Sequence, residues 1–178
     1  QRLDSETTDF VFEETDLDEI IRTSVRKYAR QFIAKKISMS YEPVETTVIT
    51  DKKWLSFVIE QVISNAVKYT KTGGIKIYLE DGDGTMSVPV QKASHRKEDD
   101  GENSGMKSVR LVIEDTGIGI RAEDLPRICE MGYTGCNGHE GQHSSGIGLY
   151  LCSRILKKLG HTFSITSKEG VGTVVKIG

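Results

Sequence analysis

The sequence predicts an α+β fold, a two-layer α/β sandwich in which three helices cover one face of a mixed, mostly antiparallel sheet. Three segments carry apolar residues at helical spacing, and several others carry the alternating or β-branched pattern of strands. Helices and strands come in mixed order along the chain. Mixed order favours a single sheet that is covered on one face by helices.

The first predicted helix begins after Asp16, an N-cap residue with Glu19 three positions later as the second half of a capping box. A strand is expected just before it, over 9–14, because apolar and polar residues alternate there. The apolar residues of the helix recur at helical spacing and make it one long amphipathic helix: Leu17, Ile20, Ile21, Val25, Tyr28, Ala29, Phe32 and Ile33.

The second predicted helix begins after Asp51, and Gly73-Gly74 is expected to end it. The third spans about 148–159 and stops at Gly160. Pro43 is expected in the turn between two short strands. The core stripe of the second helix is Leu55, Ile59, Val62, Ile63 and Ala66. The remaining strands are predicted near 37–41, 46–49, 75–79, 109–114, 162–167 and 173–177.

A low-complexity insertion separates two of these strands. Residues 81–107 are rich in Gly, Asp, Glu, Lys and Ser, and 91–104 contain no large apolar residue. Such a composition buries too little apolar surface to offset the entropy of ordering, so we predict a flexible hairpin tip. A solvated loop without a role is favoured over a docking role.

Length and composition limit the classes of function. The 178 residues favour one domain, and 37% hydrophobic with 28% charged residues is ordinary for a globular protein. A net charge of -2 gives no basic face for nucleic acid, and no apolar run approaches the roughly 20 residues of a membrane helix. Because the first residue is Gln1, we interpret the chain as a piece of a longer protein. Three cysteines without a Cys-x-x-Cys pair indicate free thiols in a reducing cytoplasm.

The first candidate for chemistry is an acidic turn spaced by glycines, Glu114-Asp115-Thr116-Gly117-Ile118-Gly119-Ile120, which follows a β-branched run. A carboxylate at the end of a buried strand needs donors, and an adenine amino group and a trapped water can supply them. Gly117 and Gly119 would let the backbone approach a planar base without Cβ clashes. The turn alone is equally consistent with Asp115 capping neighbouring amides.

Polar residues of the second helix form another candidate. Gln61, Asn65, Lys68 and Tyr69 fall at i, i+4, i+7 and i+8, so they share a face that is distinct from the apolar stripe. The Asn65 amide oxygen suits a hard cation such as Mg²⁺, and Lys68 offers a point charge to phosphate. The alternative is a solvated helix side, which this helix alone favours.

A glycine-rich segment, residues 132–148, is the third candidate. It holds six glycines in 17 residues and leads directly into a helix start, where backbone amides attract phosphate. It contains neither a Walker A loop nor a Rossmann fingerprint. Cys136, His139 and His143 have a spacing that could hold zinc, but a fourth ligand is missing, so zinc is disfavoured.

These motifs together resemble the ATP-binding catalytic domain of sensor histidine kinases, whose superfamily includes gyrase B, Hsp90 and MutL. The resemblance covers nearly the whole chain, and four boxes in the right order make it specific. It implies the Bergerat-type ATP-binding fold for 9–178, with 1–8 as the end of a preceding dimerisation hairpin or linker. The four boxes are 61–70 (N box), 114–120 (G1 box), 146–149 (G2 box) and 170–173 (the last Gly-x-Gly-Thr box).

Three further stretches resemble one group within that family. The amino-acid sequences of 124–127, 132–138 and 148–152 resemble those of the bacitracin-type, intramembrane-sensing kinases that work beside ABC transporters. This resemblance implies a cytoplasmic domain of a protein anchored in the bacterial cell membrane. Cys129, Met131 and His139 depart from the family pattern, which usually has Phe, a basic residue and Arg there.

The resemblance also implies a role for each motif. Asn65 would bind Mg²⁺ with Gln61 nearby, so these two are the candidate catalytic and metal-binding residues. Asp115 would take the adenine amino group, and Thr173 would help through water. Residues 132–147 would be the ATP lid, whose closure gates phosphoryl transfer. The full set expected to contact the nucleotide is Asn65, Lys68, Tyr69, Asp115, Gly117, Gly119, Ile120, Gly132, Tyr133, Thr134, Gly146, Ile147, Gly148, Leu149 and Thr173.

One family segment, His-Glu/Asp-x-x-Thr/Asn-Pro, does not occur in the sequence. The family's phospho-accepting histidine lies on a dimerisation hairpin, so we predict that this chain is a monomer that binds Mg-ATP and cannot autophosphorylate alone. The expected acceptor is a histidine on a separate domain of the same kinase, for relay to a response regulator. The alternatives are a serine kinase or ATPase of the superfamily, against which Gln61 argues, and a degenerate nucleotide-binding docking module.

Overall fold

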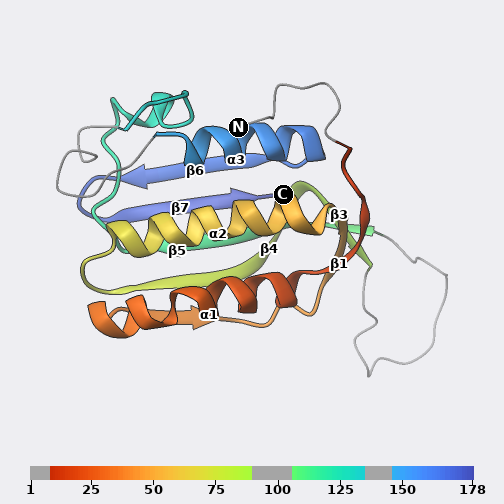
Figure 1. Cartoon of the computed structure of the whole chain (residues 1–178), viewed down its shortest axis with the longest axis horizontal. Helices are drawn as coiled ribbons and strands as arrows, with labels where there is room; N and C mark the ends of the chain where they lie inside the picture. Colours follow the sequence, from red (N-terminus) through yellow and green to blue (C-terminus); the bar gives the residue numbers. More distant parts are fainter. Residues whose placement is uncertain (1–8, 90–105, 135–145) are drawn as a thin grey trace.

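The computed structural model describes residues 9–89, 106–134 and 146–178 of the chain. Their centre is a five-stranded sheet (Figure 1). The second strand in sequence runs parallel to its neighbour, and the other three pairs are antiparallel. The order across the sheet is β2 (Ser38–Tyr41), β4 (Gly74–Pro89), β5 (Met106–Asp115), β7 (Gly172–Ile177) and β6 (Phe163–Lys168).

Three α-helices of the described ranges lie on one face of this sheet: α1 (Leu17–Lys35), α2 (Lys52–Tyr69) and α3 (Gly148–Leu159). Helix α2 lies between the other two (Figure 1). A small second sheet pairs β1 (Glu13–Asp16) with β3 (Thr47–Thr50). The predicted α+β sandwich is confirmed. Within the described ranges, no helix combines the length and the hydropathy that crossing a membrane requires.

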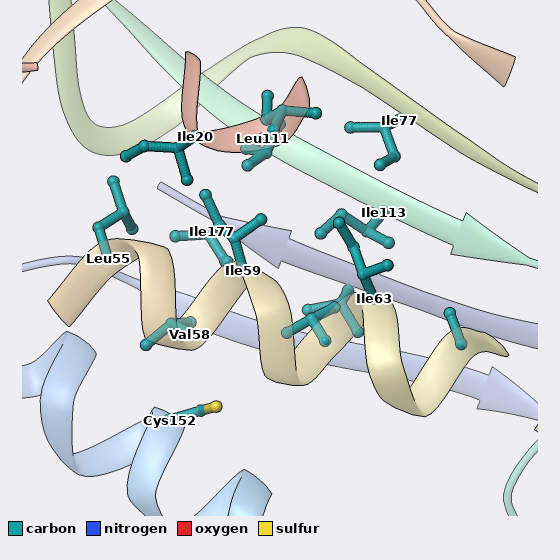
Figure 2. Close-up of a cluster of buried hydrophobic side chains, with 14 of the residues drawn as sticks. Ile20, Leu55, Val58, Ile59, Ile63, Ile77, Leu111, Ile113, Cys152 and Ile177 are labelled. Carbon is teal, nitrogen blue, oxygen red and sulfur yellow. The ribbon is translucent and has the colours of Figure 1, made fainter. Parts of the chain in front are cut away.

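The core lies between α2 and the sheet (Figure 2). Ile59 and Ile63 of α2 are fully buried in one cluster with Leu111 and Ile113 of β5 and Ile177 of β7. Burying one such side chain stabilises a fold by about 1.5–3 kcal/mol. This packing fixes α2 against the two central strands, and it therefore also fixes the polar face of α2 beside the ends of those strands.

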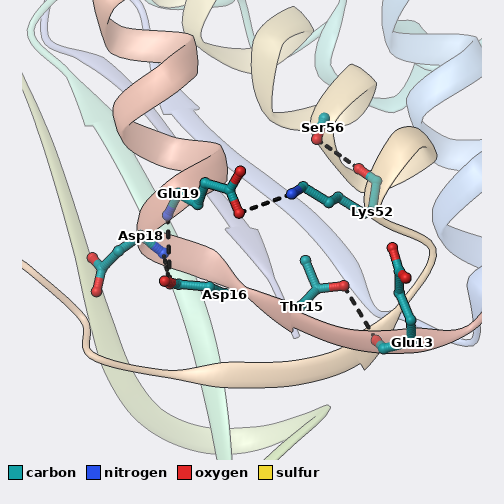
Figure 3. A network of polar contacts seen from close by, with 7 residues as sticks. All are labelled: Glu13, Thr15, Asp16, Asp18, Glu19, Lys52 and Ser56. Carbon is teal, nitrogen blue, oxygen red and sulfur yellow. Dashed lines mark hydrogen bonds and ion pairs between the residues drawn. The ribbon is translucent and has the colours of Figure 1, made fainter.

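Only one half of the capping box that was predicted at the start of α1 is present (Figure 3). The Asp16 carboxylate accepts hydrogen bonds from the backbone amides of Asp18 (2.8 Å) and Glu19 (3.4 Å), as an N-cap residue does. The Glu19 carboxylate pairs instead with the Lys52 ammonium at 2.8 Å. The predicted capping box is wrong because an ammonium on the neighbouring helix is a stronger partner for a carboxylate than a backbone amide.

Two other expectations for the N-terminal part are wrong. The strand predicted at 9–14 is Glu13–Asp16, because its register with β3 covers only these residues. Phe10 packs instead against the Trp54 ring, with 6.2 Å between the ring centroids. Ile33, which the helical spacing places in the core, is 77% exposed. It follows the buried Phe32 by one helical step of about 100°, which carries it off the buried stripe.

The two later helices end differently from each other. Helix α3 has the predicted bounds, and Gly160 caps it in the left-handed conformation with φ 77°. Helix α2 ends at Tyr69, and Thr70 follows in extended conformation. Gly73 (φ 96°) and Gly74, the first residue of β4, lie beyond this point, so the prediction that they end α2 is wrong.

Strands β4 and β5 run further than predicted. After a register shift at Asp81, residues 86–89 pair with 106–109. Both ends of the insertion predicted over 81–107 are therefore strand, because ladder hydrogen bonds use backbone groups, which a composition argument does not consider. The middle of the insertion, 90–105, lies outside the described residues.

Candidate functional site

A cavity of about 370 Å³ opens at the end of the sheet where β5 ends and β7 begins. It is bordered by the second half of α2, the start of α3 and the residues flanking the 3₁₀ helix η1 (Leu125–Arg127). These segments meet at the left end of the molecule in Figure 1. The volume lies in the range of clefts that hold small molecules.

Most residues that the sequence predicted for a site line this one cavity. Three predicted residues, Gly117, Gly132 and Ile147, are outside the lining, although each is adjacent in the chain to a residue in or next to it. The fold therefore brings all three candidate motifs together. The predicted residues in the lining are Gln61, Asn65, Lys68, Tyr69, Asp115, Gly119, Ile120, Tyr133, Thr134, Gly146, Gly148, Leu149 and Thr173.

Asp115 lies half-buried at the end of β5. Its Oδ1 accepts a hydrogen bond from the Gly117 amide at 2.8 Å, and the Thr173 amide also donates to the carboxylate. Burial raises the pKa of this carboxyl above its ordinary value, and the two amides oppose that rise. A carboxylate accepts about four hydrogen bonds, so these amides leave capacity for a donor in the cavity. Asp115 thus both caps neighbouring amides and faces the cavity.

The glycines of the acidic turn allow close packing within the protein itself. A Cβ at Gly119, which has φ 71°, would lie 2.1 Å from the Lys168 carbonyl oxygen. A Cβ at Gly117 would lie 2.7 Å from the Tyr69 carbonyl oxygen. The turn is therefore pressed between α2 and the end of β6, a requirement that the sequence argument about an approaching base did not include.

The four polar residues of α2 line the cavity together, on the shared face that their spacing predicted, whereas the helix alone favoured a solvated side. Lys68 Nζ lies 5.1 Å from the centroid of the Tyr69 ring, within the range of a cation–π contact. Gln61 lies against the start of α3, since a Cβ at Gly148 would be 2.8 Å from Gln61 Oε1. Asn65 also lines the cavity, on the same face of the helix.

The described residues contain no group of three or more His, Cys, Asp or Glu side chains that could hold a metal ion. The amide oxygens of Asn65 and Gln61 are hard donors in the cavity lining. Mg²⁺ takes most of its other ligands from water and substrate phosphates, so this donor set fits Mg²⁺ that arrives with a phosphorylated ligand. The zinc candidates Cys136, His139 and His143 lie outside the described residues.

The two ends of the predicted lid meet beside the cavity. The Gly132 amide donates a hydrogen bond to the Gly146 carbonyl at 3.1 Å. Gly146 has φ 65°, and a Cβ there would lie 2.5 Å from the Gly132 carbonyl carbon. Tyr133 and Thr134 line the cavity, and 135–145 lie outside the described residues.

Sequence reasoning missed Asp124 as a cavity residue. This residue is 6% exposed, and its carboxylate accepts a hydrogen bond from the Tyr133 hydroxyl. The Arg127 guanidinium lies 4.4 Å from the centroid of the same Tyr133 ring. These contacts fasten one end of the predicted lid to η1. The available signal is an acidic residue just before a proline-containing helix start, a pattern that marks a helix but does not reveal the contact with Tyr133.

A hydroxyl network lies behind Thr173. The Ser167 hydroxyl accepts from the Ile120 amide at 2.8 Å and donates to the Gly172 carbonyl at 2.8 Å. Ser167 and Thr173 hydroxyl oxygens are 2.9 Å apart. Because the single Ser167 proton goes to Gly172, the Thr173 hydroxyl is the donor in this pair, and its lone pairs remain available to the cavity. Ser167 was also missed by sequence reasoning.

Comparison with known proteins identifies the family of the chain. Residues 50–178 match the family described as histidine kinase-, DNA gyrase B-, and HSP90-like ATPase. The chain is 34% identical to the sensor histidine kinase YxdK of Bacillus subtilis, covering 98% of this chain and 48% of YxdK. It is 30% identical to the sensor protein BceS of Halalkalibacterium halodurans, covering 93% of this chain and 42% of BceS. The chain thus spans about half the length of these relatives, which are bacitracin-type kinases as predicted.

Solved structures share the fold. The catalytic domain of histidine kinase ThkA superposes with a TM-score of 0.69 at 20% identity over 94% of each chain. Full-length ShkA in complex with AMPPNP gives a TM-score of 0.70 at 19% identity, over 95% of this chain and 31% of ShkA. At these identities the likeness concerns the fold. With the family match over 50–178 and the meeting of the motifs in one cavity, this chain belongs to the histidine kinase-, DNA gyrase B- and HSP90-like ATPases.

Proposed function

We propose that this chain is the catalytic domain of a sensor histidine kinase, which binds Mg-ATP in the cavity and donates the γ-phosphoryl group to a histidine on a separate dimerisation domain. The observation that carries the proposal is that the N box, the G1 and G2 boxes and both lid ends contribute residues to one cavity. The names of the relatives, which are sensor kinases, and the AMPPNP complex of ShkA support it.

The end of the cavity near Asp115 is proposed to hold the adenine ring. The Asp115 carboxylate accepts a hydrogen bond from the exocyclic amino group of adenine. The Thr173 hydroxyl accepts one from a water that bridges to the ring. Apolar side chains of Ile113, Ile120 and Val175 line the cavity and exclude water from the faces of the base. Guanine has a carbonyl oxygen where adenine has its amino group, so the carboxylate repels it and the site selects adenine.

The other end is proposed to hold the phosphates. Helix α3 starts at Gly148, and its N-cap, Ile147, makes no side-chain capping bond, which leaves backbone amides for a phosphate. Lys68 adds a positive charge, and Asn65 with Gln61 would hold Mg²⁺. When bound, the ion neutralises charge on the phosphate oxygens. In this type of transfer, positioning and charge neutralisation supply most of the catalysis.

The proposal extends to the partners of the whole protein. They are a histidine-bearing dimerisation domain of the same kinase, a response regulator and an ABC transporter. The protein would be anchored in the bacterial cell membrane with this domain in the cytoplasm. The support is that sensor kinases of about twice this length match the chain over 93–98% of its residues.

The test is calorimetric titration of AMPPNP into the chain with and without Mg²⁺, followed by transfer from labelled ATP to a histidine-bearing dimerisation hairpin supplied as a separate domain. We expect one nucleotide per chain, tighter binding with Mg²⁺, and acid-labile phosphate on the hairpin. Failure of the folded chain to bind would contradict the proposal. Steady hydrolysis without any transfer would replace it with an ATPase.

A further inference from the structure

The C-terminal end of α2 lacks the left-handed residue that commonly ends such a helix. Thr70 occupies the cap position in extended conformation, with φ −92° and ψ 115°. Every α-helix leaves its last four carbonyl groups without a partner inside the helix. In α2 these groups belong to Ala66, Val67, Lys68 and Tyr69.

Backbone amides satisfy the first and the last of the four. The Thr70 amide donates to the Ala66 carbonyl at 3.0 Å. The Ile118 amide, which belongs to the acidic turn, donates to the Tyr69 carbonyl at 3.1 Å. The end of α2 and the turn that carries Asp115 are thereby joined directly.

One side chain from another helix satisfies the two carbonyls in the middle. Lys35, in the last turn of α1, places Nζ 2.5 Å from the Val67 oxygen and 3.1 Å from the Lys68 oxygen, with the Thr70 oxygen at 3.4 Å. The three protons of an ammonium match these three acceptors. Its positive charge also opposes the negative end of the helix dipole.

In the folded chain Lys35, and not bulk water, is the partner of these carbonyls. Val67 and Thr70 are 0% exposed, so carbonyls there would lose their partners if Lys35 were removed. The Lys35 side chain is itself partly buried, and this burial lowers the pKa of its ammonium below its ordinary value. The three carbonyl oxygens stabilise the ammonium charge at this position.

The turn held by Lys35 is the turn that faces the nucleotide cavity. Asn65, Lys68 and Tyr69 all line the cavity, whereas Lys35 does not. Lys35 therefore acts from outside the cavity, through backbone carbonyls in the turn whose side chains line the cavity.

We propose that Lys35 is a positioning residue of the nucleotide site, which fastens the last turn of α2 and so sets the direction of Lys68 and Tyr69 in the cavity. The inference rests on the proposed function, because it concerns the phosphate side of the same site. It adds a residue from α1, which precedes the match over 50–178, to the machinery of nucleotide binding.

The test compares three variants of the chain. Lys35→Met keeps the side-chain stem and removes the donors, and Lys35→Arg restores a charged donor. Lys27→Met is the matched control, because Lys27 also joins α1 to α2, through Glu60 at 2.6 Å, but Glu60 is outside the cavity lining. The dissociation constant for Mg-AMPPNP is measured by calorimetry, and the free energy of unfolding by urea titration.

We expect Lys35→Met to weaken nucleotide binding about tenfold, which corresponds to about 1.4 kcal/mol. Lys27→Met should bind like the unmodified chain, and Lys35→Arg should recover most of the affinity. A merely structural role would instead lower the stability of both Met variants without separating their affinities. If Lys35→Met does not fold, Lys35→Gln, which keeps one donor group, carries the same comparison.

Two results would overturn the inference. One is equal affinity of Lys35→Met and the unmodified chain. The other is equal weakening by Lys27→Met and Lys35→Met. In both cases the unmodified chain still binds nucleotide, so the proposed function stands. If the unmodified chain does not bind, the proposed function fails first and the role of Lys35 fails with it.

Discussion

Asp115 has two properties that oppose each other. Burial raises the pKa of its carboxyl, and the charge of Glu114 adds to the rise, while two backbone amides lower it. A raised pKa in the folded chain means that the charged form is disfavoured there, so this group contributes stability at low pH that is lost as pH rises through the folded pKa. The proposed contact with the nucleotide, in contrast, uses the charged form of Asp115 as the hydrogen-bond acceptor.

Replacing Asp115→Asn should therefore separate binding from stability. We expect affinity for Mg-AMPPNP to fall about 10- to 100-fold, the range for losing a hydrogen bond to a charged group. Without nucleotide, the free energy of unfolding at pH 7 should stay equal or rise. Calorimetry and urea titration measure the two quantities. Asp81→Asn, at an exposed strand position, is the control, and equal binding by both variants would remove Asp115 from the adenine site.

His161 is the second titratable residue with a clear expectation. Its Nε2 lies 3.0 Å from the hydroxyl of the fully buried Thr50, and burial lowers the pKa of its ring. A lowered pKa means that the folded chain favours the neutral ring, so stability is present above the ordinary pKa of about 6.5 and is lost as pH falls through the folded value.

We expect the free energy of unfolding to decrease between pH 7 and pH 5, and His161→Gln to decrease less over the same range. Urea titrations at three pH values measure both slopes. The variant is needed because carboxylates also titrate near pH 5. Identical slopes for the two proteins would show that another group causes the pH dependence.

At the scale of one element, the two ends of the predicted lid, Gly132 and Gly146, meet at a point that we call the lid base. Their close approach depends on backbone geometry. Gly146 (φ 65°) lies against Gly132, whereas a Cβ added at Gly160 (φ 77°) would meet nothing within 4 Å. Both glycines are left-handed, so alanine should cost about 1–2 kcal/mol at either position for conformation alone. Only Gly146 adds a collision with the backbone.

Gly146→Ala should therefore lower nucleotide affinity, while Gly160→Ala should lower stability without changing affinity. The reason is that a Cβ at Gly146 pushes apart the two lid ends that border the cavity. Thermal denaturation and AMPPNP titration of both variants measure the difference. A normal affinity for Gly146→Ala would mean that the lid base tolerates the displacement.

What the sequence could predict at the element scale depends on how local the signal is. The caps at Asp51 and Gly160 were predicted because each acts within its own turn; the Asp51 carboxylate accepts from the Trp54 amide at 3.0 Å. The end of α2 was missed because Lys35 lies 32 positions away from Val67 in the sequence. Asp124 was missed for the same reason, since its partner Tyr133 is brought to it by a turn. Residue types at motif positions were readable, but contacts across elements were not.

At the scale of the whole molecule, the clearest expectation comes from the proposal that the acceptor histidine of the phosphoryl group lies on a separate domain. The chain has four histidines, His95, His139, His143 and His161, and none belongs to the family's acceptor segment. His161, the one in a described range, is partly buried just after α3.

The chain alone should therefore bind ATP and remain unphosphorylated. Incubation with labelled ATP, followed by acid treatment, measures acid-labile phosphate on the protein. The positive control is the same mixture with a histidine-bearing hairpin domain. Acid-labile label on this chain alone would contradict the assignment of the acceptor to a separate domain. Light scattering should also give the mass of a monomer.

The ribbon formed by the far ends of β4 and β5 has a practical consequence. Pro89 and Met106 are register partners at the end of this ribbon. Strand β4 runs toward the end of the molecule opposite the cavity (Figure 1). An inserted protein whose own two termini lie close together can be joined to these two residues. Doubling the length of a flexible linker there costs only about 0.6 kcal/mol. A fluorescent reporter or a surface anchor inserted between these residues would leave the nucleotide cavity open to solution.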